Sequence, residues 1–419
     1  MELVTMWLTN RLVSVTTAMV LCASVSFAQT ADPRESARTH AGPFYLTPSL
    51  ALDELGIDTN VFNNALELSD FTFTVVPGVD VAVPFGTRGV ITTSTFAEFI
   101  YYNRYSSERS INPDIKVRGE YALNRVTLFL SPSYINSRRQ PSLEIDQRVR
   151  HTTTDISGGG MVRMSRRLSV EAGGGVSRLS YDDDSIFNDT SLRETLNRRT
   201  QSAWLAIHHE ITPITRASVR ATYGIEDFDD IPARNARTFA FMPAVAFKPP
   251  ALISGSAAVG VRRFRPENLL IEDFTGVVAH VSLSYSLQGF TRFRFRADRD
   301  LSFSYLLLTP YYVTNQYGLD VDRHLGGRFD VTGGVNWQQN TYRAIAGLEP
   351  LAGGLEPLAV EPPVDRLTTW SLGVGYRMAR SRRVGFDVTY RTRETDALRG
   401  APYSGLRVMW SVDSGLQRP

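Results

Sequence analysis

Residues 291–303 read TRFRFRADRDLSF and decide the fold class, because charged and apolar side chains alternate along them. Charged residues stand at 292, 294, 296, 298 and 300 on one face, and apolar residues stand at 293, 295, 297, 301 and 303 on the other. A period of two is that of a β-strand, whose successive side chains point to opposite faces. The stretch therefore predicts a strand with one charged face and one apolar face.

The same alternation recurs along most of the chain, most clearly at 214–226 and 383–393. Most of the segments exceed the five or six residues usual in soluble sheets and suit tilted strands that cross a membrane. We predict about eighteen strands; a count of sixteen also stays open, because 44–54 and 343–365 carry weak patterns. The predicted strands are 44–54, 69–83, 88–105, 110–122, 125–138, 148–163, 168–181, 196–210, 214–228, 234–247, 250–264, 272–286, 290–305, 309–322, 327–343, 365–379, 383–395 and 403–413.

The connections between these strands alternate between tight and long. Outer-membrane barrels have this asymmetry, with short periplasmic turns and long outer loops. An even strand count then places both termini in the periplasm. The sequence predicts an all-β, antiparallel up-and-down transmembrane barrel over residues 44–419. The tight connections are 85–88, 122–125, 165–167, 212–214, 248–250 and 324–326.

The N-terminus has the features of an export signal. Arg11 precedes an apolar run over 12–23, and Ser26-Phe27-Ala28 supplies the small residues that a signal peptidase reads. We expect cleavage after Ala28, so residues 1–28 form the signal peptide and the polar residues 29–43 a flexible periplasmic lead-in. The only cysteine, Cys22, lies in the leader, so the mature chain has no disulfide or thiolate site.

Charge and composition limit the partners. The chain carries 45 basic and 43 acidic residues, a net charge of +2, which excludes a generic nucleic-acid binder. Aromatic residues gather near predicted strand ends, where rings with a polar edge settle at a membrane interface, although ordinary β-propensity is an alternative explanation. The expected partners are outer-membrane lipid and the barrel assembly machinery.

An array of arginines is the candidate functional feature. If the apolar face meets lipid, the polar face lines the lumen, the space enclosed by the barrel. Guanidinium groups suit carboxylate and phosphate, so the array suggests a preference for anionic solutes or acidic sugars. The alternative is a ladder of structural ion pairs that stiffens the wall and selects nothing. The array comprises Arg216, Arg220, Arg292, Arg294, Arg296, Arg377, Arg391 and Arg393.

Two histidine sites carry weaker signals. His208 and Glu210 share a strand face, and we expect a hydrogen-bonded lumen pair rather than a catalytic one. His280 lies among Ser282, Ser284 and Ser286, which resembles the setting of a serine hydrolase, but no nucleophile motif accompanies it. The sequence therefore predicts no catalytic residue.

Acidic and glycine runs complete the candidates. Asp182-Asp183-Asp184 lacks the spaced ligands of a calcium loop, which favours a solvated outer loop. The runs at 158–160 and 173–175 flank a tight turn, where facing glycines let neighbouring strands bend. We predict no metal and no cofactor.

Two short stretches carry a family resemblance. Leu46-Thr47-Pro48-Ser49-Leu50 is followed by Asp58-Thr59-Asn60-Val61-Phe62, and Val75-Val76-Pro77-Gly78-Val79 opens the next strand. They resemble the outer-membrane β-barrel porin family often linked to exopolysaccharide gene clusters, whose members begin with a similar loop and strand. The resemblance implies a barrel that helps secreted polysaccharide cross the outer membrane.

The sequence thus predicts a porin-like passive conduit in the bacterial outer membrane, serving exopolysaccharide export or diffusion of anionic solutes. We expect the loops at 182–196 and 343–365 to restrict the lumen. A structural barrel plugged by its own side chains is the principal alternative, and an outer-membrane enzyme is a further one. At eighteen strands a barrel is wide enough for an aqueous channel.

Overall fold

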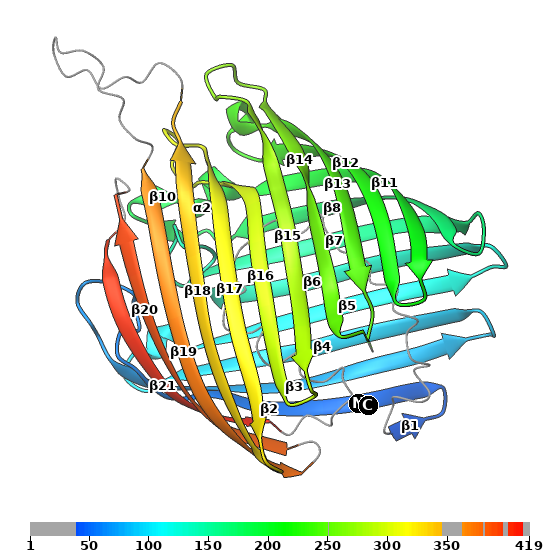
Figure 1. Cartoon of the computed structure of the whole chain (residues 1–419). Coiled ribbons are helices and arrows are strands. Elements are labelled where there is room, and N and C mark those ends of the chain that lie inside the picture. Colours follow the sequence, from blue (N-terminus) through cyan, green and yellow to red (C-terminus); the bar gives the residue numbers. More distant parts are fainter. Residues whose placement is uncertain (1–38, 250, 346–362, 380–381, 397–400, 414–419) are drawn as a thin grey trace.

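The chain folds into one closed ring of antiparallel strands (Figure 1). The structure is a computed structural model that describes residues 39–249, 251–345, 363–379, 382–396 and 401–413. Eighteen long strands form the ring, and the first pairs with the last, Ile57 opposite Val408, which closes it. No helix in this described part of the chain is long and apolar enough to cross a membrane.

The strand count is the predicted eighteen, and the alternative of sixteen is wrong. Each of the eighteen predicted segments corresponds to one strand. The strands are β2 (Phe44–Asp58), β3 (Asp70–Phe85), β4 (Gly89–Tyr102), β5 (Ser110–Ala122), β6 (Val126–Arg139), β7 (Val149–Arg163), β8 (Leu168–Tyr181), β11 (Arg198–Thr212), β12 (Thr215–Phe228), β13 (Ala236–Phe247), β14 (Ile253–Pro266), β15 (Phe274–Leu287), β16 (Thr291–Phe303), β17 (Tyr311–Leu325), β18 (Phe329–Arg343), β19 (Val364–Ala379), β20 (Arg382–Thr395) and β21 (Tyr403–Asp413).

The smaller elements lie outside this ring. A short strand, β1 (Thr39–Ala41), pairs with the start of β2, so the last residues of the predicted lead-in form a hairpin. The strands β9 (Ile186–Phe187) and β10 (Thr190–Ser191) form a small hairpin that leads into the helix α2 (Leu192–Leu196). Two 3-10 turns, η1 (Ser106–Glu108) and η2 (Pro232–Arg234), belong to connecting loops.

Short turns and long loops gather at opposite ends of the ring. The predicted tight connections lie at one end, with 248–250 described only to residue 249. Residues 59–69, 103–109, 140–148, 182–197, 229–235, 267–273 and 304–310 connect strands at the other end. We call these the turn end and the loop end. Since β2 begins and β21 finishes at the turn end, both ends of the ring lie there.

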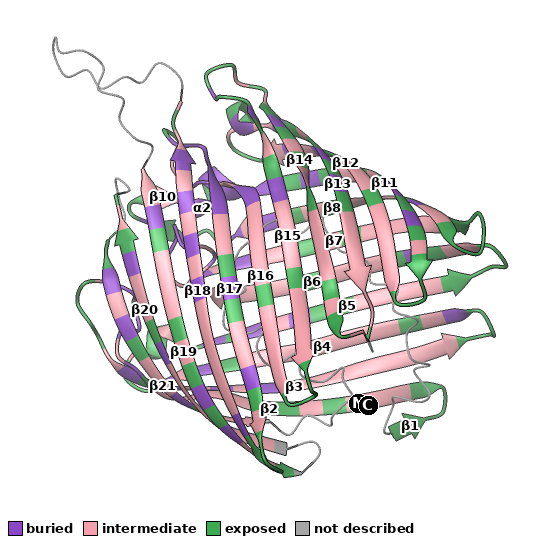
Figure 2. Ribbon diagram, in the orientation of Figure 1, coloured by how far each residue is buried: buried purple, intermediate pink, exposed green. Residues whose placement is uncertain are grey.

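The outward face of the strands is apolar, as the alternation predicts. Leu205, Phe241, Leu319 and Leu372 are each about half exposed, between 43% and 62%. A contiguous apolar band of this kind needs a lipid environment. The buried residues collect near the loop end instead of along a central core (Figure 2).

The two glycine runs face each other across β7 and β8, with Gly159 opposite Gly173. The space they leave is filled from the neighbouring strands. A Cβ on Gly173 would lie 2.4 Å from the ring of Trp204, and one on Gly159 would lie 2.9 Å from the ring of Phe129. The glycines therefore make room for two aromatic side chains on the polar face of the wall.

Candidate functional site

The loop 140–148 crosses the mouth of the barrel at the loop end. It joins the fifth and sixth strands of the ring, whereas residues 304–310 join the thirteenth and fourteenth, so a contact between them spans about half of the ring. Glu144 makes that contact: its Oε1 accepts a hydrogen bond from Ser304 Oγ at 2.5 Å, and its Oε2 accepts one from the Tyr305 backbone N–H at 3.3 Å. Leu143 and Ile145 on either side of Glu144 are buried.

The same loop is bound to a third part of the wall. Asp146 Oδ2 accepts a hydrogen bond from Arg393 Nη1 of β20 at 2.5 Å. Arg393 also donates to Asp365 of β19 at 2.9 Å, and only 2% of Arg393 is exposed. Tyr342 of β18 donates its hydroxyl to Asp365 at 2.8 Å. A buried ion-pair chain therefore fixes the tip of the loop to β18, β19 and β20.

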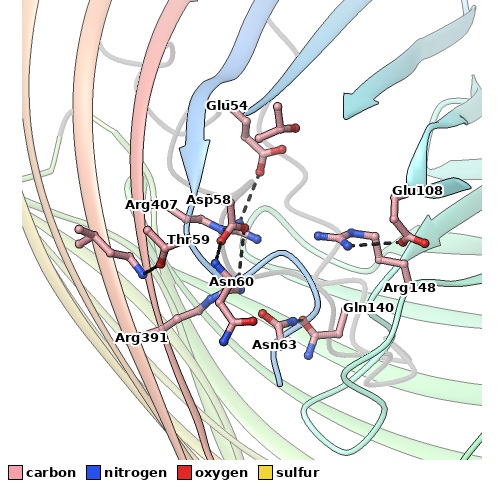
Figure 3. A network of polar contacts seen from close by, with 12 residues as sticks. Glu54, Asp58, Thr59, Asn60, Asn63, Glu108, Gln140, Arg148, Arg391 and Arg407 are labelled. Carbon is pink, nitrogen blue, oxygen red and sulfur yellow. Dashed lines mark hydrogen bonds and ion pairs between the residues drawn. The ribbon is translucent and has the colours of Figure 1, made fainter. Parts of the chain in front are cut away.

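The loop 59–69 folds inward beside it (Figure 3). Asn63 Nδ2 donates to Gln140 Oε1 at 3.1 Å and to the Asp146 carbonyl at 3.3 Å. Asn60 Nδ2 donates to the Asn64 carbonyl at 2.8 Å and to the Ser404 carbonyl at 2.7 Å. Asn60 belongs to the stretch that carries the family resemblance, so that stretch anchors an inward loop.

The predicted restricting loop 182–196 also belongs to this assembly. Leu192 and Leu196 of α2 are buried in one cluster with Ile145. Phe187 packs edge-on against Tyr305 with ring centroids 5.1 Å apart. We call the four loops 59–69, 140–148, 182–197 and 304–310 the cap. The other predicted loop, 343–365, falls largely on residues outside the described ranges.

Arg234 ties the cap to the loop 229–235. Its guanidinium donates to three backbone carbonyls, those of Thr195 at 2.7 Å, Ser304 at 2.5 Å and Pro310 at 2.9 Å. These carbonyls come from two cap loops, 182–197 and 304–310. Arg234 is 3% exposed, so its loss would leave buried carbonyl groups without donors.

Burial shifts the pKa values of the charged cap groups. Burial raises the pKa of Glu144 to about 8, although the hydrogen bonds from Ser304 and Tyr305 partly oppose the shift. Burial also raises the pKa of Asp146 to about 6 against the opposing charge of Arg393. Burial together with the like charge of Arg198 lowers the pKa of Arg234 to about 10. Glu144 therefore keeps its proton at neutral pH.

The predicted arginines stand on the polar face of the strands, and most contact carboxylates. Arg292 lies directly opposite Asp322 in register. The other seven arginines form ion pairs: Arg216 with Glu210 (3.1 Å), Arg220 with Glu171 (3.1 Å), Arg294 with Asp322 (2.6 Å), Arg296 with Asp320 (2.6 Å), Arg377 with Asp330 (3.3 Å), Arg391 with Asp58 (3.5 Å) and Arg393 with Asp146 and Asp365.

The expected pair of His208 with Glu210 does not form. His208 Nε2 lies 3.2 Å from Glu171 Oε2 of the neighbouring strand, and Glu210 instead accepts from Arg216. Residues i and i+2 of one strand lie almost 7 Å apart, because each residue advances the strand by about 3.4 Å. The adjacent strand therefore supplies a closer partner for His208. Trp204 also donates its indole N–H to Glu171, at 2.8 Å.

The remaining candidates have structural contacts. His280 lies between two carboxylates, with Nδ1 3.3 Å from Asp298 and Nε2 3.6 Å from Asp300. Asp183 of the acidic run accepts a hydrogen bond from Arg193 in the same loop. The described residues contain no group of three or more histidine, cysteine, aspartate and glutamate side chains that could hold a metal ion.

A closed ring of eighteen antiparallel strands, apolar outside and covered by loops at one mouth, defines a porin-like β-barrel of the bacterial outer membrane. Residues 32–415 match the model of the family described as "Putative beta-barrel porin 2". The chain belongs to this family, as the resemblance implies. Its family and its fold are those of channel proteins rather than enzymes.

Solved structures of similar shape are distant in sequence. OpdK of Pseudomonas aeruginosa with vanillate has a TM-score of 0.47 and 9% identity, covering 88% of this chain and 98% of that one. OccK2 (OpdF) of the same organism with glucuronate has a TM-score of 0.49 and 12% identity, covering 89% and 98%. A BenF-like porin of Pseudomonas fluorescens Pf-5 has a TM-score of 0.46 and 10% identity, covering 88% of this chain and 99% of that one. At these values the likeness carries no information on the solute.

No curated protein sequence matches the chain.

Proposed function

We propose that this barrel is a conduit for small anionic solutes whose loop-end mouth is restricted by the cap. The single observation that supports the choice of an anion is the state of Arg391. Its Nε and Nη2 atoms are buried and make no hydrogen bond to a described residue. A buried guanidinium with unused donors favours an acceptor such as a carboxylate or phosphate oxygen.

The neighbours of Arg391 explain why its donors stay unused (Figure 3). Asp58 Oδ2 accepts from Arg407 Nε at 2.7 Å, whereas Arg391 Nη2 is only within 3.5 Å of the same oxygen. The other oxygen, Oδ1, accepts from the Asn60 backbone N–H at 3.0 Å. Asp58 is therefore occupied, and an incoming anion would bind Arg391 without first displacing a strong partner.

Two other functions carry less support. Export of exopolysaccharide rests on the family resemblance, and a polymer would have to separate the contacts of Glu144 and Asp146 that span the mouth. A structural barrel is favoured by the carboxylate partners of the predicted arginines, which fit a stiffening ladder. Conductance separates a conduit from a structural barrel.

The test is single-channel recording of the refolded full chain in a planar bilayer under a salt gradient. Wild-type openings should have a reversal potential that favours anions, and Arg391→Gln should shift it towards cations. Arg366→Gln is the matched control, because Arg366 is exposed on the neighbouring strand β19. Unchanged selectivity in Arg391→Gln contradicts the proposed anion site. A folded but silent barrel contradicts the conduit and supports a structural role.

Export and insertion are part of the same proposal. Removal of residues 1–28 would release the mature chain to the barrel assembly machinery, with both termini in the periplasm. The mass of the protein extracted from outer membranes tests the predicted cleavage after Ala28, because a retained leader would add the mass of those residues.

A further inference from the structure

An open groove lies on the outward surface at the loop end, away from the lumen. It has a volume of about 570 Å³ and lies where the loop-side ends of β3, β4, β5 and β7 meet. Its walls are aromatic, aliphatic and basic. The side chains used below are Phe73, Phe99, Tyr101, Ile111, Arg109 and Arg150.

The apolar part of the groove continues the lipid-facing band. Phe99 is 42% exposed and Ile111 is 53% exposed, and the two lie directly opposite each other in register. Phe73 stacks on Tyr101 with ring centroids 4.8 Å apart. Tyr101 therefore marks the upper edge of an aromatic surface, which is where rings with a polar edge settle at a membrane interface.

Two guanidinium groups stand over this surface and are held by neutral acceptors. Arg109 lies with its Cζ 4.2 Å above the centre of the Tyr101 ring, and its Nε donates to the Tyr102 carbonyl at 2.9 Å. Arg150 Nη1 donates to Asn136 Oδ1 at 2.5 Å and to the Ile111 carbonyl at 3.4 Å.

The positive charge of these two groups is not balanced locally. Among the described residues, no carboxylate forms an ion pair with Arg109 or Arg150. The nearby Glu108 is directed to other partners, Arg138 at 3.7 Å and Arg148 at 3.5 Å. The groove therefore combines an apolar surface with two guanidinium groups held in fixed positions. Their positive charge favours binding of an anion.

The outward rim repeats this charge pattern along the ring. Arg138 lies directly opposite Arg150, Arg178 opposite Arg199, and Arg237 opposite Arg265. Like charges directly opposite each other on a sheet are destabilising unless something compensates them. Loop carboxylates compensate some of these pairs, such as Asp229 for Arg178 at 2.8 Å. At the groove Glu108 compensates Arg138, whereas Arg150 and Arg109 pair with no carboxylate among the described residues, which points to an anion from outside the protein.

The position of the groove relative to the membrane indicates which kind of molecule carries that anion. Below it the outward face is apolar, as at Tyr134 and Ile156, and above it the polar loops begin. The guanidinium groups thus lie at the boundary between hydrocarbon and headgroups. An anion at this depth that also covers an apolar floor is a lipid with a phosphorylated headgroup.

We propose that this groove is a binding site for a phosphate-bearing lipid of the leaflet at the loop end, with Arg109 and Arg150 binding the phosphate and Phe99 and Ile111 contacting an acyl chain. Paired guanidinium donors match the oxygens of a phosphate group. The site is independent of transport through the lumen, so it holds for an open or a closed barrel.

The test measures lipid retained by the full chain. The refolded protein is incubated with vesicles of phosphatidylcholine containing one tenth bis-phosphorylated lipid A, extracted in mild detergent and weighed by native mass spectrometry. Wild type should retain lipid A and little phosphatidylcholine. Arg109→Gln/Arg150→Gln should lower the retained lipid A by about tenfold or more, because each lost contact is a charge-assisted hydrogen bond.

Three controls separate the reasons for which a variant could lose lipid A: loss of charge in general, loss of the paired donors, and unfolding. Arg166→Gln/Arg167→Gln removes the same charge at the turn end and should retain lipid A like wild type. Arg109→Lys/Arg150→Lys keeps the charge but not the paired donors, and should fall between wild type and the glutamine variant. Heat-modifiability on gels checks that each variant is folded.

Three outcomes would overturn the proposal. One is equal retention of lipid A by wild type and the folded Arg109→Gln/Arg150→Gln variant. Another is equal retention of phosphatidylcholine and lipid A by wild type. The third is complete release of lipid A by millimolar inorganic phosphate, which would show a site for the free ion without a contribution from the acyl chain.

Discussion

Asp146 and Arg393 form an ion pair at 2.5 Å across the mouth of the barrel, although 247 residues separate them in the chain. Asp146 lies at the tip of an inward loop, and Arg393 lies on a strand near the end of the chain. The pair fixes the loop in its position across the mouth. Any widening of the mouth on this side must break this contact.

We predict that Asp146→Asn loosens the cap. The substitution keeps the size of the side chain but removes one charge, while Arg393 keeps Asp365 as a partner. A buried hydrogen bond between charged groups contributes about 1.5–3 kcal/mol, so the backbone amides of 140–148 should exchange with solvent about tenfold faster or more. Hydrogen–deuterium exchange followed by mass spectrometry measures this.

Asp183→Asn is the matched control for that experiment. Asp183 also pairs with an arginine of its own loop, but it is highly exposed, so little energy depends on the pair. Exchange over 140–148 should stay unchanged in this variant. Faster exchange in Asp183→Asn with none in Asp146→Asn would contradict the role assigned to the Asp146 contact.

Glu144 makes opening of the cap dependent on pH. Its pKa is about 8 in the closed cap and would return towards its ordinary value of 4.5 once exposed to water. The closed state therefore binds the proton more tightly. Between pH 4.5 and 8 each rise of one unit should favour opening by at most tenfold, and above about pH 8 the effect should level off.

Single-channel recordings from pH 5 to pH 9 measure this dependence as the fraction of time spent open. Arg234, a charged neighbour of Glu144 whose pKa burial lowers to about 10, keeps its charge over most of this range, and Asp146 acts in the same direction near pH 6. Glu144→Gln should remove most of the pH dependence. Opening that increases as pH falls would contradict the assigned direction.

The strands could be predicted from the sequence because their signal is local. Charged and apolar residues alternate within each segment, as in 291–303, and the tight turns mark the strand ends. The predicted bounds differ from the structure by a few residues, most at the first strand, which continues to Asp58 instead of ending at residue 54. The irregular pairing of β2 near Glu54 interrupts the alternation there.

Of the cap, the sequence predicts only the restricting loop 182–196; the contacts between the cap loops could not be predicted, since they join loops that are far apart in the chain. The strand alternation does not distinguish the loop 140–148 from other connections, although Leu143 and Ile145 are apolar residues in an otherwise polar loop and are a usable signal. The partner of His208 was wrong for a related reason. Choosing Glu171 over Glu210 requires the register between two strands, which the sequence of either strand alone does not contain.

Glu171 should be a stabilising centre of the wall near the turn end. It is fully buried and binds Trp204, His208 and Arg220 from two neighbouring strands. Glu171→Ala would leave Arg220 without its carboxylate, a change that typically costs about 3–5 kcal/mol when the pair is buried. Urea unfolding of the barrel in lipid, followed by the shift in gel mobility, measures the loss.

Glu194→Ala provides the comparison for that variant. Glu194 is exposed in the helix α2, so its removal should change stability by less than about 1 kcal/mol. If both variants unfold at the same urea concentration as wild type, the network around Glu171 does not stabilise the barrel.

The glycines beside this network should be intolerant of even one methyl group. A Cβ on Gly173 would lie 2.4 Å from the Trp204 ring and 2.7 Å from the Gly158 carbonyl oxygen, so either the indole or the backbone must shift. A shift of the indole would also disturb its hydrogen bond to Glu171. We expect Gly173→Ala to destabilise the barrel by about 1–3 kcal/mol, the usual cost of overpacking.

Gly333→Ala tests whether that cost comes from crowding or from the loss of a glycine as such. Gly333 also lies within a strand, β18, but a Cβ there would meet nothing within 4 Å. Alanine should be neutral or slightly stabilising at this position, since glycine weakens a strand interior. Equal destabilisation by the two substitutions, measured by urea unfolding in lipid, would show that the strands need glycine for backbone freedom. Destabilisation by Gly173→Ala alone would show that the wall needs the space for Trp204.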